Sequence, residues 1–467
     1  MKNKVKFLWE KLKNTEKPML IDWLIVCGII LLCYVSFNHG DILATATHGK
    51  DLVECTLKGD FLNFYDYTKS TAVYPITIYI FFAVWSLPVF LVFKILGIPM
   101  WGLLAYNSMP YPVLLWFKLL PTLFYLASAY ILYKIVIEIK LDVKTAKWIA
   151  FLFISSPIAI FSQFIFGQYD SFGLFFILWA FYMLIKKRYY SFSIICSIAI
   201  TFKLFAVFFF IPLLLLFEKR VIHIIKHTLI AMSGYVLTTL LFSNSKGYSD
   251  AMQFSSAIAP RLFVSGISTV MGVISLFTVA MIAICIFAYN KQAKNDDQFF
   301  ACAIYIPFVV FGSLFAFILW HPQWVIFLTP FLSLAIILNS KSNSCLILHS
   351  AMAIGYIGTT VLCFPNNVDS NLIYYSVFSK VLEGKQITSL YNLFNFNGML
   401  GNNFFYSLFA GSIILLIVMY LPVLKNADNF KNTLQSKKFF IGDRIFLLIR
   451  PLTLVLYILP TYYFAFR

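Results

Sequence analysis

Charged residues are scarce in this chain: they make up 12% of its 467 residues, whereas 61% are hydrophobic. Soluble domains are about half apolar and about a quarter charged, so this composition excludes a soluble globular protein. The apolar runs are mostly 17–25 residues long, which is the length of a bilayer-spanning helix rather than a barrel strand. The composition therefore predicts an all-α polytopic membrane protein without a large soluble domain.

Three further absences narrow the possibilities. The eight cysteines are scattered, mostly inside apolar runs, so they indicate neither a disulfide framework nor a metal site. No small-residue cleavage site follows the first apolar run, which we therefore expect to remain as a permanent helix. No glycine-rich nucleotide loop and no D-x-D motif occurs in a soluble segment, which argues against a nucleotide-sugar donor on the inner face.

Hydropathy predicts about 13 transmembrane helices. Their expected ranges are 19–37, 113–134, 147–165, 171–185, 190–203, 205–217, 227–243, 268–289, 298–319, 324–339, 344–363, 404–424 and 445–463. The run 190–217 is longer than one helix needs, and Lys203 near its middle marks the expected turn.

The basic residues predict the orientation of these helices. With the N-terminus inside, the inner loops hold 24 of the 36 lysines and arginines, and every inner loop contains at least one of them. These inner loops are 1–18, 134–147, 186–189, 218–226, 290–297, 340–343 and 425–444. The net charge of +17 is thus distributed as the membrane topology requires, and the basic residues can contact anionic lipid headgroups. We therefore expect no nucleic-acid partner.

The segment 73–97 is long enough to span the membrane, but counting it as a span would turn the basic loops outward. We therefore expect it to lie in the first outer loop, 38–112, as a re-entrant or interfacial helix pair broken near Pro88.

In this topology, the unusual polar residues of the apolar regions fall on the outer side. They are Asp41 after the first span, Gln168, Tyr169 and Asp170 in GQYD, Lys203 in ITFKLF, Arg261 in IAPRLF and His321 in HPQW. Ionisable groups at a membrane boundary are costly unless they are paired or functional. Their alignment predicts a shared polar site at the outer leaflet.

Each residue also has a simpler explanation. Asp170 could cap the N-terminus of the following helix, and Lys203 could extend its ammonium to the interface. His321 could be a turn residue before a proline. Three other acids of the same loop compete with Asp41, namely Asp51, Asp60 and Asp66.

The ordered set of motifs resembles the GT-C superfamily of polyprenyl-phosphate-sugar glycosyltransferases. GQYD at a span junction is followed after about 30 residues by the lysine of ITFKLF, and YPIT and HPQW are similar to further elements of that family. The likeness covers roughly residues 19–340. It implies a catalytic transmembrane module over 1–340 and additional C-terminal helices over 341–467, with an outer loop at 364–403.

The resemblance also implies roles for the residues. Asp41 would be the catalytic base, and Lys203 would contact the donor phosphate with Arg261 and His321 as helpers. Gln168, Tyr169 and Asp170 would bind sugar or order the loop. The chain lacks the adjacent Asp-Glu pair that some relatives carry in the first loop, so a divalent metal is possible but not required by the motif.

The implied function is an inverting transfer of a sugar from a polyprenyl-phosphate carrier to a glycan or lipid-linked acceptor. Lysine-, phenylalanine-, isoleucine- and asparagine-rich usage suggests an AT-rich bacterial genome, and with it an undecaprenyl-type carrier and a cell-wall or surface glycan as product. The predicted topology then places the active site on the extracytoplasmic face of the cytoplasmic membrane. The Asn- and aromatic-rich loop 364–403 is a candidate acceptor site, although this composition is also ordinary for a loop. A polysaccharide polymerase and a secondary transporter remain alternatives.

Overall fold

The computed structural model describes most of the chain. The described residues are 14–15, 17–101, 109–256, 259–339, 342–363, 368–385, 387–394, 399–425, 439–440, 447 and 449–466. The architecture is all-α apart from two short antiparallel pairs of strands. These pairs are β1 (Asn14–Thr15) with β4 (Phe439–Phe440), and β2 (Gly266–Thr269) with β3 (Gly272–Ser275).

The first half of the chain forms helices that turn back and forth. They are α2 (Leu20–Ser36), α3 (Gly40–Leu57), α4 (Phe64–Tyr67), α5 (Ile76–Ile95), α6 (Tyr111–Glu138), α7 (Val143–Ile154), α8 (Pro157–Ile160), a π-helix (Phe161–Phe166), α9 (Asp170–Ile185), α10 (Tyr189–Phe202), α11 (Phe205–Phe217) and α12 (Val221–Leu241).

The second half continues the bundle. Its helices are α13 (Lys246–Ser256), α14 (Leu276–Asn290), α15 (Asp296–Phe317), a 3₁₀ helix (Pro322–Leu328), α16 (Thr329–Leu338), α17 (Ser342–Gly358), α18 (Val368–Tyr374), α19 (Ser379–Leu382), α20 (Leu390–Phe394), α21 (Met399–Lys425) and α24 (Val455–Phe466).

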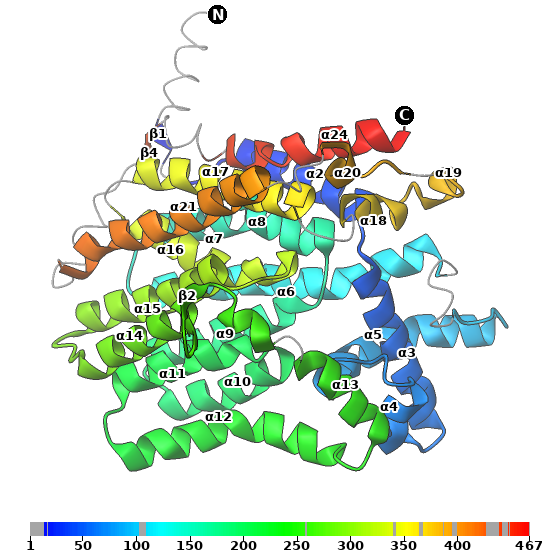
Figure 1. The fold of residues 1–467 in the computed structure, drawn as a ribbon, viewed down its shortest axis with the longest axis horizontal. Helices are drawn as coiled ribbons and strands as arrows, with labels where there is room; N and C mark the ends of the chain where they lie inside the picture. Colours follow the sequence, from blue (N-terminus) through cyan, green and yellow to red (C-terminus); the bar gives the residue numbers. More distant parts are fainter. Residues whose placement is uncertain are drawn as a thin grey trace, which may run out of the picture.

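Most long helices lie side by side in similar directions, whereas α3 runs across them at one end of the bundle (Figure 1). Helices α4, α5, α13, α18, α19 and α20 gather at this same end. We call it the Asp41 end, because α2 ends there and Asp41 is the second residue of α3. The turns that join α9 to α10 and α11 to α12 lie at the opposite end.

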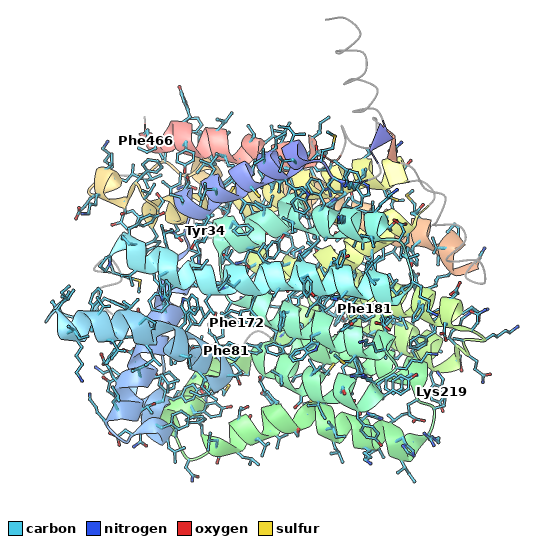
Figure 2. All side chains as sticks on the ribbon, turned by 180° about the vertical axis from the view of Figure 1, so that it is seen from behind. Tyr34, Phe81, Phe172, Phe181, Lys219 and Phe466 are labelled. Atoms are coloured by element: carbon cyan, nitrogen blue, oxygen red, sulfur yellow. The ribbon has the colours of Figure 1, made fainter. Side chains whose placement is uncertain are left out.

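An aromatic core holds the helices together. Phe81 of α5 meets Phe172 of α9 with ring centroids 5.6 Å apart (Figure 2). Trp85 and Trp116 stack at 4.6 Å, and each indole nitrogen donates to the other residue's carbonyl, which ties α5 to α6. Edge and stacked ring contacts of this kind add to the dispersion energy of a packed interior.

The chain is an integral membrane protein by its apolar helices. Among the described residues, seven helices are long and apolar enough to cross a membrane, or up to nine if each of two bent pairs is one span. Every one of the 13 expected ranges overlaps a helix, and Lys203 does mark the turn between α10 and α11. In the described part of the chain, five further apolar helical stretches have only 10–17 residues: α9, α10, α11, α14 and Pro322–Leu338. At 1.5 Å per residue, such lengths are too short to cross a hydrocarbon core of about 30 Å alone.

Two details differ from the sequence expectations. Residues 73–97 do not form a pair broken near Pro88, because α5 is one helix that continues through this proline. A proline removes one backbone hydrogen bond, and packing can keep a membrane helix intact despite that loss. Residues 268–275 belong to the hairpin β2–β3, so the helix expected at 268–289 begins only at Leu276.

The C-terminal helices pack on the preceding module through a buried polar contact. Arg450 pairs with His349 of α17, with Nη1 2.7 Å from Nδ1, and donates through Nη2 to Ser155 Oγ at 2.8 Å. The expected outer loop 364–403 contains α18, α19, α20 and the start of α21. Its residues 364–367, 386 and 395–398 lie outside the described residues, and so do most of the expected inner loops 1–18 and 425–444.

Candidate functional site at the Asp41 end

The site begins at the break between α2 and α3. His39 is the N-cap of α3, and its Nδ1 accepts a hydrogen bond from the backbone amide of Asp41 at 3.2 Å. The His39 ring stacks on Phe166, the last residue of the π-helix, with centroids 4.0 Å apart. These two contacts fix the N-terminus of α3 and thereby the position of Asp41.

A buried lysine joins this break to the GQYD turn. Lys118 of α6 donates from Nζ to the carbonyls of Tyr34, Phe37 and Phe164 at 2.8, 2.6 and 2.6 Å. It thereby satisfies carbonyls left open at the end of α2 and in the π-helix. Gly167 ends the π-helix at φ +70°, and a Cβ there would lie 3.2 Å from Lys118 Cε. The glycine of GQYD is therefore required by both its backbone angle and its neighbour.

A chain of two amides orients the Asp41 carboxylate. Gln323 Nε2 donates to Gln168 Oε1 at 2.8 Å, and Gln168 Nε2 donates to Asp41 Oδ2. His39 Nδ1 lies 3.5 Å from the same carboxylate oxygen. The Asp41 side chain is still 41% exposed, so its other oxygen can reach a substrate.

A second carboxylate is enclosed beside the first. Lys203 Nζ lies 3.1 Å from Asp170 Oδ1, and the Asp170 side chain is only 3% exposed. The Lys203 ammonium also faces three aromatic rings, at 4.8 Å from Tyr169, 5.4 Å from Trp324 and 5.7 Å from Tyr74. Aromatic faces attract a cation, so the ring contacts and the ion pair together stabilise the Lys203 ammonium.

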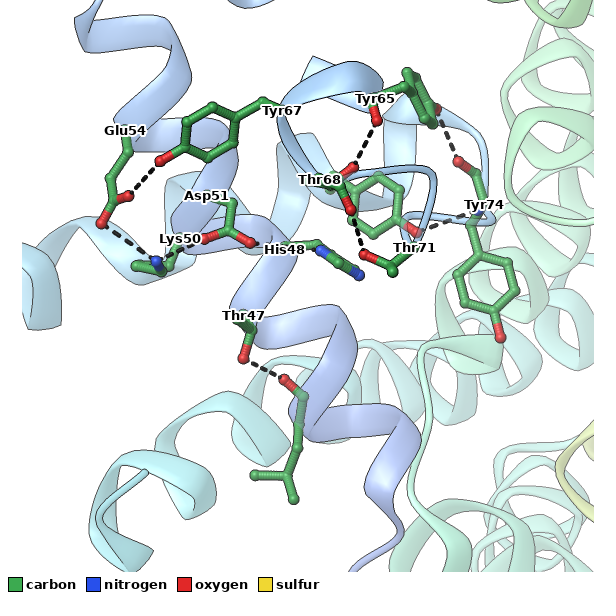
Figure 3. Close-up of polar contacts among 12 residues, drawn as sticks. Thr47, His48, Lys50, Asp51, Glu54, Tyr65, Tyr67, Thr68, Thr71 and Tyr74 are labelled. Carbon is green, nitrogen blue, oxygen red and sulfur yellow. Dashed lines mark hydrogen bonds and ion pairs between the residues drawn. The ribbon is translucent and has the colours of Figure 1, made fainter. Parts of the chain in front are cut away.

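The first outer loop holds Tyr74 against this lysine. Tyr65 donates from its hydroxyl to the Tyr74 carbonyl at 2.8 Å, and the Tyr74 amide donates to the Tyr79 hydroxyl at 3.1 Å. In Figure 3 the Tyr74 ring points away from the neighbouring network of His48, Lys50, Asp51 and Glu54. The backbone of Tyr74 is therefore fixed on both sides while its ring enters the site.

His321 and Arg261 lie at the edge of the same site. His321 is the N-cap of the 3₁₀ helix, and its ring lies 4.9 Å from that of Trp324. Burial, with Arg261 and Lys203 nearby, lowers the pKa of His321 to about 4. The imidazole is consequently neutral at neutral pH, so it can take part in hydrogen bonds but carries no positive charge. No carboxylate of the described residues forms an ion pair with the partly exposed Arg261.

The competing acids of the first loop have other environments. Asp51 lies 2.6 Å from Lys50 Nζ, within the network of Figure 3. Asp66 accepts from Ser245 Oγ and from the Gly247 amide, both at 2.7 Å, and so ties α4 to α13. Asp60 is exposed. Asp41 is thus the acid of this loop that contacts the GQYD turn.

The simpler explanations for two other residues hold only in part. Asp170 is not the N-cap of α9, which is Tyr169, but it is the first residue of this helix, where a carboxylate stabilises the open amides. Lys203 does not extend to the surface, because its side chain is 12% exposed and paired.

Four residues of the site were not expected from the sequence. These are His39, Lys118, Gln323 and Trp324. The role of the Tyr74 ring beside Lys203 was likewise not expected. Gln323 and Trp324 belong to HPQW and Tyr74 to YPIT, so the motifs carried a signal that single-residue reasoning left unused. Nothing local distinguishes Lys118 from a lysine at a helix end, because its partners come from two distant segments.

No group of three or more His, Cys, Asp or Glu side chains that could hold a metal ion occurs in the described part of the chain. His39 and Asp41 together offer two donors. Compared with models of known protein families and with curated proteins, the chain shows no significant match. The functional assignment therefore depends on the residues of the site.

Proposed function

We propose that this protein is an inverting glycosyltransferase of the GT-C type, which moves a sugar from a polyprenyl-phosphate carrier to a glycan or lipid-linked acceptor. The supporting observation is one accessible carboxylate, Asp41, oriented by Gln168 next to the buried pair of Lys203 and Asp170. We place the reaction on the extracytoplasmic face of a bacterial cytoplasmic membrane, because the basic loops predict that orientation.

In the proposed reaction, the acceptor hydroxyl oxygen attacks the anomeric carbon. The bond between that carbon and the phosphate oxygen breaks, and polyprenyl phosphate leaves with the electron pair. Asp41 takes the hydroxyl proton, for which its exposed carboxylate is suited. Direct attack by the acceptor, without a covalent enzyme intermediate, inverts the anomeric centre.

Cationic side chains would stabilise the leaving phosphate. Arg261 has a fork of donors that matches phosphate oxygens, and no described carboxylate neutralises it. The charge of Lys203 is already balanced by Asp170, so Lys203 contributes to the phosphate only as part of this pair. Neutral His321 would serve as a hydrogen-bonding partner.

The alternatives fit this arrangement less well. A secondary transporter places its ionisable residues near the middle of the membrane, whereas these lie at helix ends on one side of the bundle. A polysaccharide polymerase acts at the same face but would need an arginine-rich outer loop, and Arg261 is the outer-loop arginine available here.

The test compares Asp41→Asn with Asp60→Asn, a matched change of an exposed acid in the same loop. At equal membrane levels, we expect Asp41→Asn to lower sugar transfer by about 10²–10⁴-fold, the usual contribution of a general base. Sugar analysis of surface glycans and of accumulated lipid-linked donor measures the effect. Unchanged glycans and donor in Asp41→Asn, or equal losses in both variants, would contradict the proposal.

A further inference from the structure

A second polar site lies at the opposite end of the bundle. Two turns, 186–188 and 218–220, and the helices that follow them line a cleft of about 330 Å³. Its basic residues are Lys187, Arg188, Arg220, His223 and His227, and its acid is Glu218. In Figure 2, Lys219 of the second turn lies far from the Asp41 end, near the other end of the long helices.

The single acid of the cleft is already neutralised. Glu218 accepts from Arg220 Nε at 3.0 Å and from Arg220 Nη2 at 2.9 Å, and two backbone amides donate to its Oε1. The Arg220 guanidinium and these amides lower the pKa of Glu218 to about 2. Glu218 therefore stays charged but paired, and the rest of the cleft has an excess of positive charge.

The other cations are available to a ligand. Lys187 contacts Asp296 at 2.6 Å, but both side chains are about half exposed, so this pair is weak and exchangeable. The Arg188 side chain is exposed and forms no ion pair with any described carboxylate. Arg188 is thus the free guanidinium at the mouth of the cleft.

Backbone amides add to the positive potential. Helix α10 begins at Tyr189, directly after the first turn of the cleft, and helix α12 begins at Val221, directly after the second turn. Neither helix has a side-chain cap or an acidic residue in its first turn. Open amides at a helix start favour an anion.

A buried histidine points to the same conclusion. His227 is 97% buried, and its Nδ1 lies 2.8 Å from Ser193 Oγ. Ser193 holds the ring in place, and the ring lines the cleft. The Tyr190 ring packs 4.9 Å from that of His227 and closes one side.

The surroundings of the cleft are apolar. Exposed side chains of α10 and α12 adjoin it, among them Ile194, Val221, Ile222, Ile225 and Leu229. Such a surface suits acyl chains, and a basic pocket between membrane helices suits a phosphate headgroup. We propose that this cleft binds the phosphate of an anionic phospholipid, whose acyl chains lie along α10 and α12.

The experiment uses the purified full-length protein in neutral detergent. Thermal unfolding is followed while phosphatidylglycerol, phosphatidylcholine or inorganic phosphate is added. We expect phosphatidylglycerol to stabilise the protein more than phosphatidylcholine. Arg188→Gln should weaken this effect by about tenfold in lipid concentration, whereas Lys294→Gln, an exposed lysine at the same end, should not.

Each outcome decides the proposal. Equal responses of Arg188→Gln and Lys294→Gln, with both proteins monodisperse, would overturn the site. Stabilisation by inorganic phosphate equal to that by phosphatidylglycerol would overturn the lipid and assign the cleft to free phosphate. His227→Gln is the second variant. If phosphatidylglycerol stabilises both Arg188→Gln and His227→Gln as much as the wild type, the site is also overturned.

Discussion

At the scale of single residues, two aspartates at the same end of the bundle have opposite environments. Asp41 is 41% exposed and held by an amide, whereas Asp170 is 3% exposed and paired with a lysine. Carboxylates of one type acquire different roles when their surroundings differ in this way. Asp41 can meet a substrate, and Asp170 stabilises the position and charge of Lys203.

His321 gives a prediction at this scale. Its pKa falls from an ordinary 6.5 to about 4 in the folded chain, so between these values the unfolded chain binds a proton that the folded chain does not. We therefore expect stability to fall as the pH is lowered from 6.5 toward 4. Thermal unfolding at pH 7, 6 and 5 should show this loss, and His321→Gln should reduce it.

The control is His223→Gln, at the opposite end of the bundle. It should keep the wild-type decrease in stability between pH 7 and 5. An identical pH profile for wild type and His321→Gln would contradict the neutral imidazole.

At the scale of secondary-structure elements, the site depends on two interrupted helices. The break between α2 and α3 positions Asp41, and the π-helix that ends at Gly167 positions Gln168. Lys118 joins both interruptions because its ammonium binds carbonyls on each side. Interruptions of membrane helices need such partners, since unpaired backbone groups are costly in lipid.

We expect Lys118→Met to destabilise the protein by about 3 kcal/mol or more, because a buried polar group left unpaired costs about 1–3 kcal/mol. Unfolding in mixed micelles with increasing denaturing detergent measures this loss. Lys134→Met is the matched control, since Lys134 is exposed on the same helix. Equal stability of the two variants would show that Lys118 does not hold the break.

At the scale of the whole molecule, the two ends of the bundle differ in character. The Asp41 end carries the crossing helix α3 (Figure 1) and the site, and the opposite end carries the turns that contain Glu218 and Asp296. Contacts such as Lys219 Nζ to the Ala288 carbonyl, at 2.8 Å, place the turn after α14 at this basic end. The positive-inside rule predicts that this lysine- and arginine-bearing end faces the cytoplasm.

Cysteine labelling tests this orientation. In a background without the eight native cysteines, Lys58→Cys at the Asp41 end should react with a membrane-impermeant maleimide in intact cells. Lys294→Cys at the basic end should react only after the cells are opened. Reaction of both residues in intact cells would contradict the predicted topology.

Local patterns were sufficient to predict much of the fold. Each of the 13 apolar ranges overlaps a helix, and the turn at Lys203 was located by a single charge in an apolar run. The continuation of α5 through Pro88 and the hairpin β2–β3 could not be predicted. Hydropathy records neither the packing that keeps a helix continuous at a proline nor the local backbone pairing of a short hairpin.

The candidate site was predicted less completely. Asp41, Gln168, Asp170 and Lys203 do come together, since topology alone puts them at one end. The alternatives for Asp170 and Lys203 could not be separated from sequence, because a cap, a surface lysine and an ion pair require the same residue types. His39, Lys118 and Gln323 were missed because each acts through a partner distant in the chain.

The sequence by itself determined that this is an apolar, helical membrane protein and which ends of its helices carry polar groups. These properties follow from composition and from the spacing of charges, which act within one segment at a time. Only the tertiary structure decided which acid is accessible, which is paired and which amides orient it. Exposure and pairing arise from contacts between distant segments, and those contacts exist only once the helices have packed.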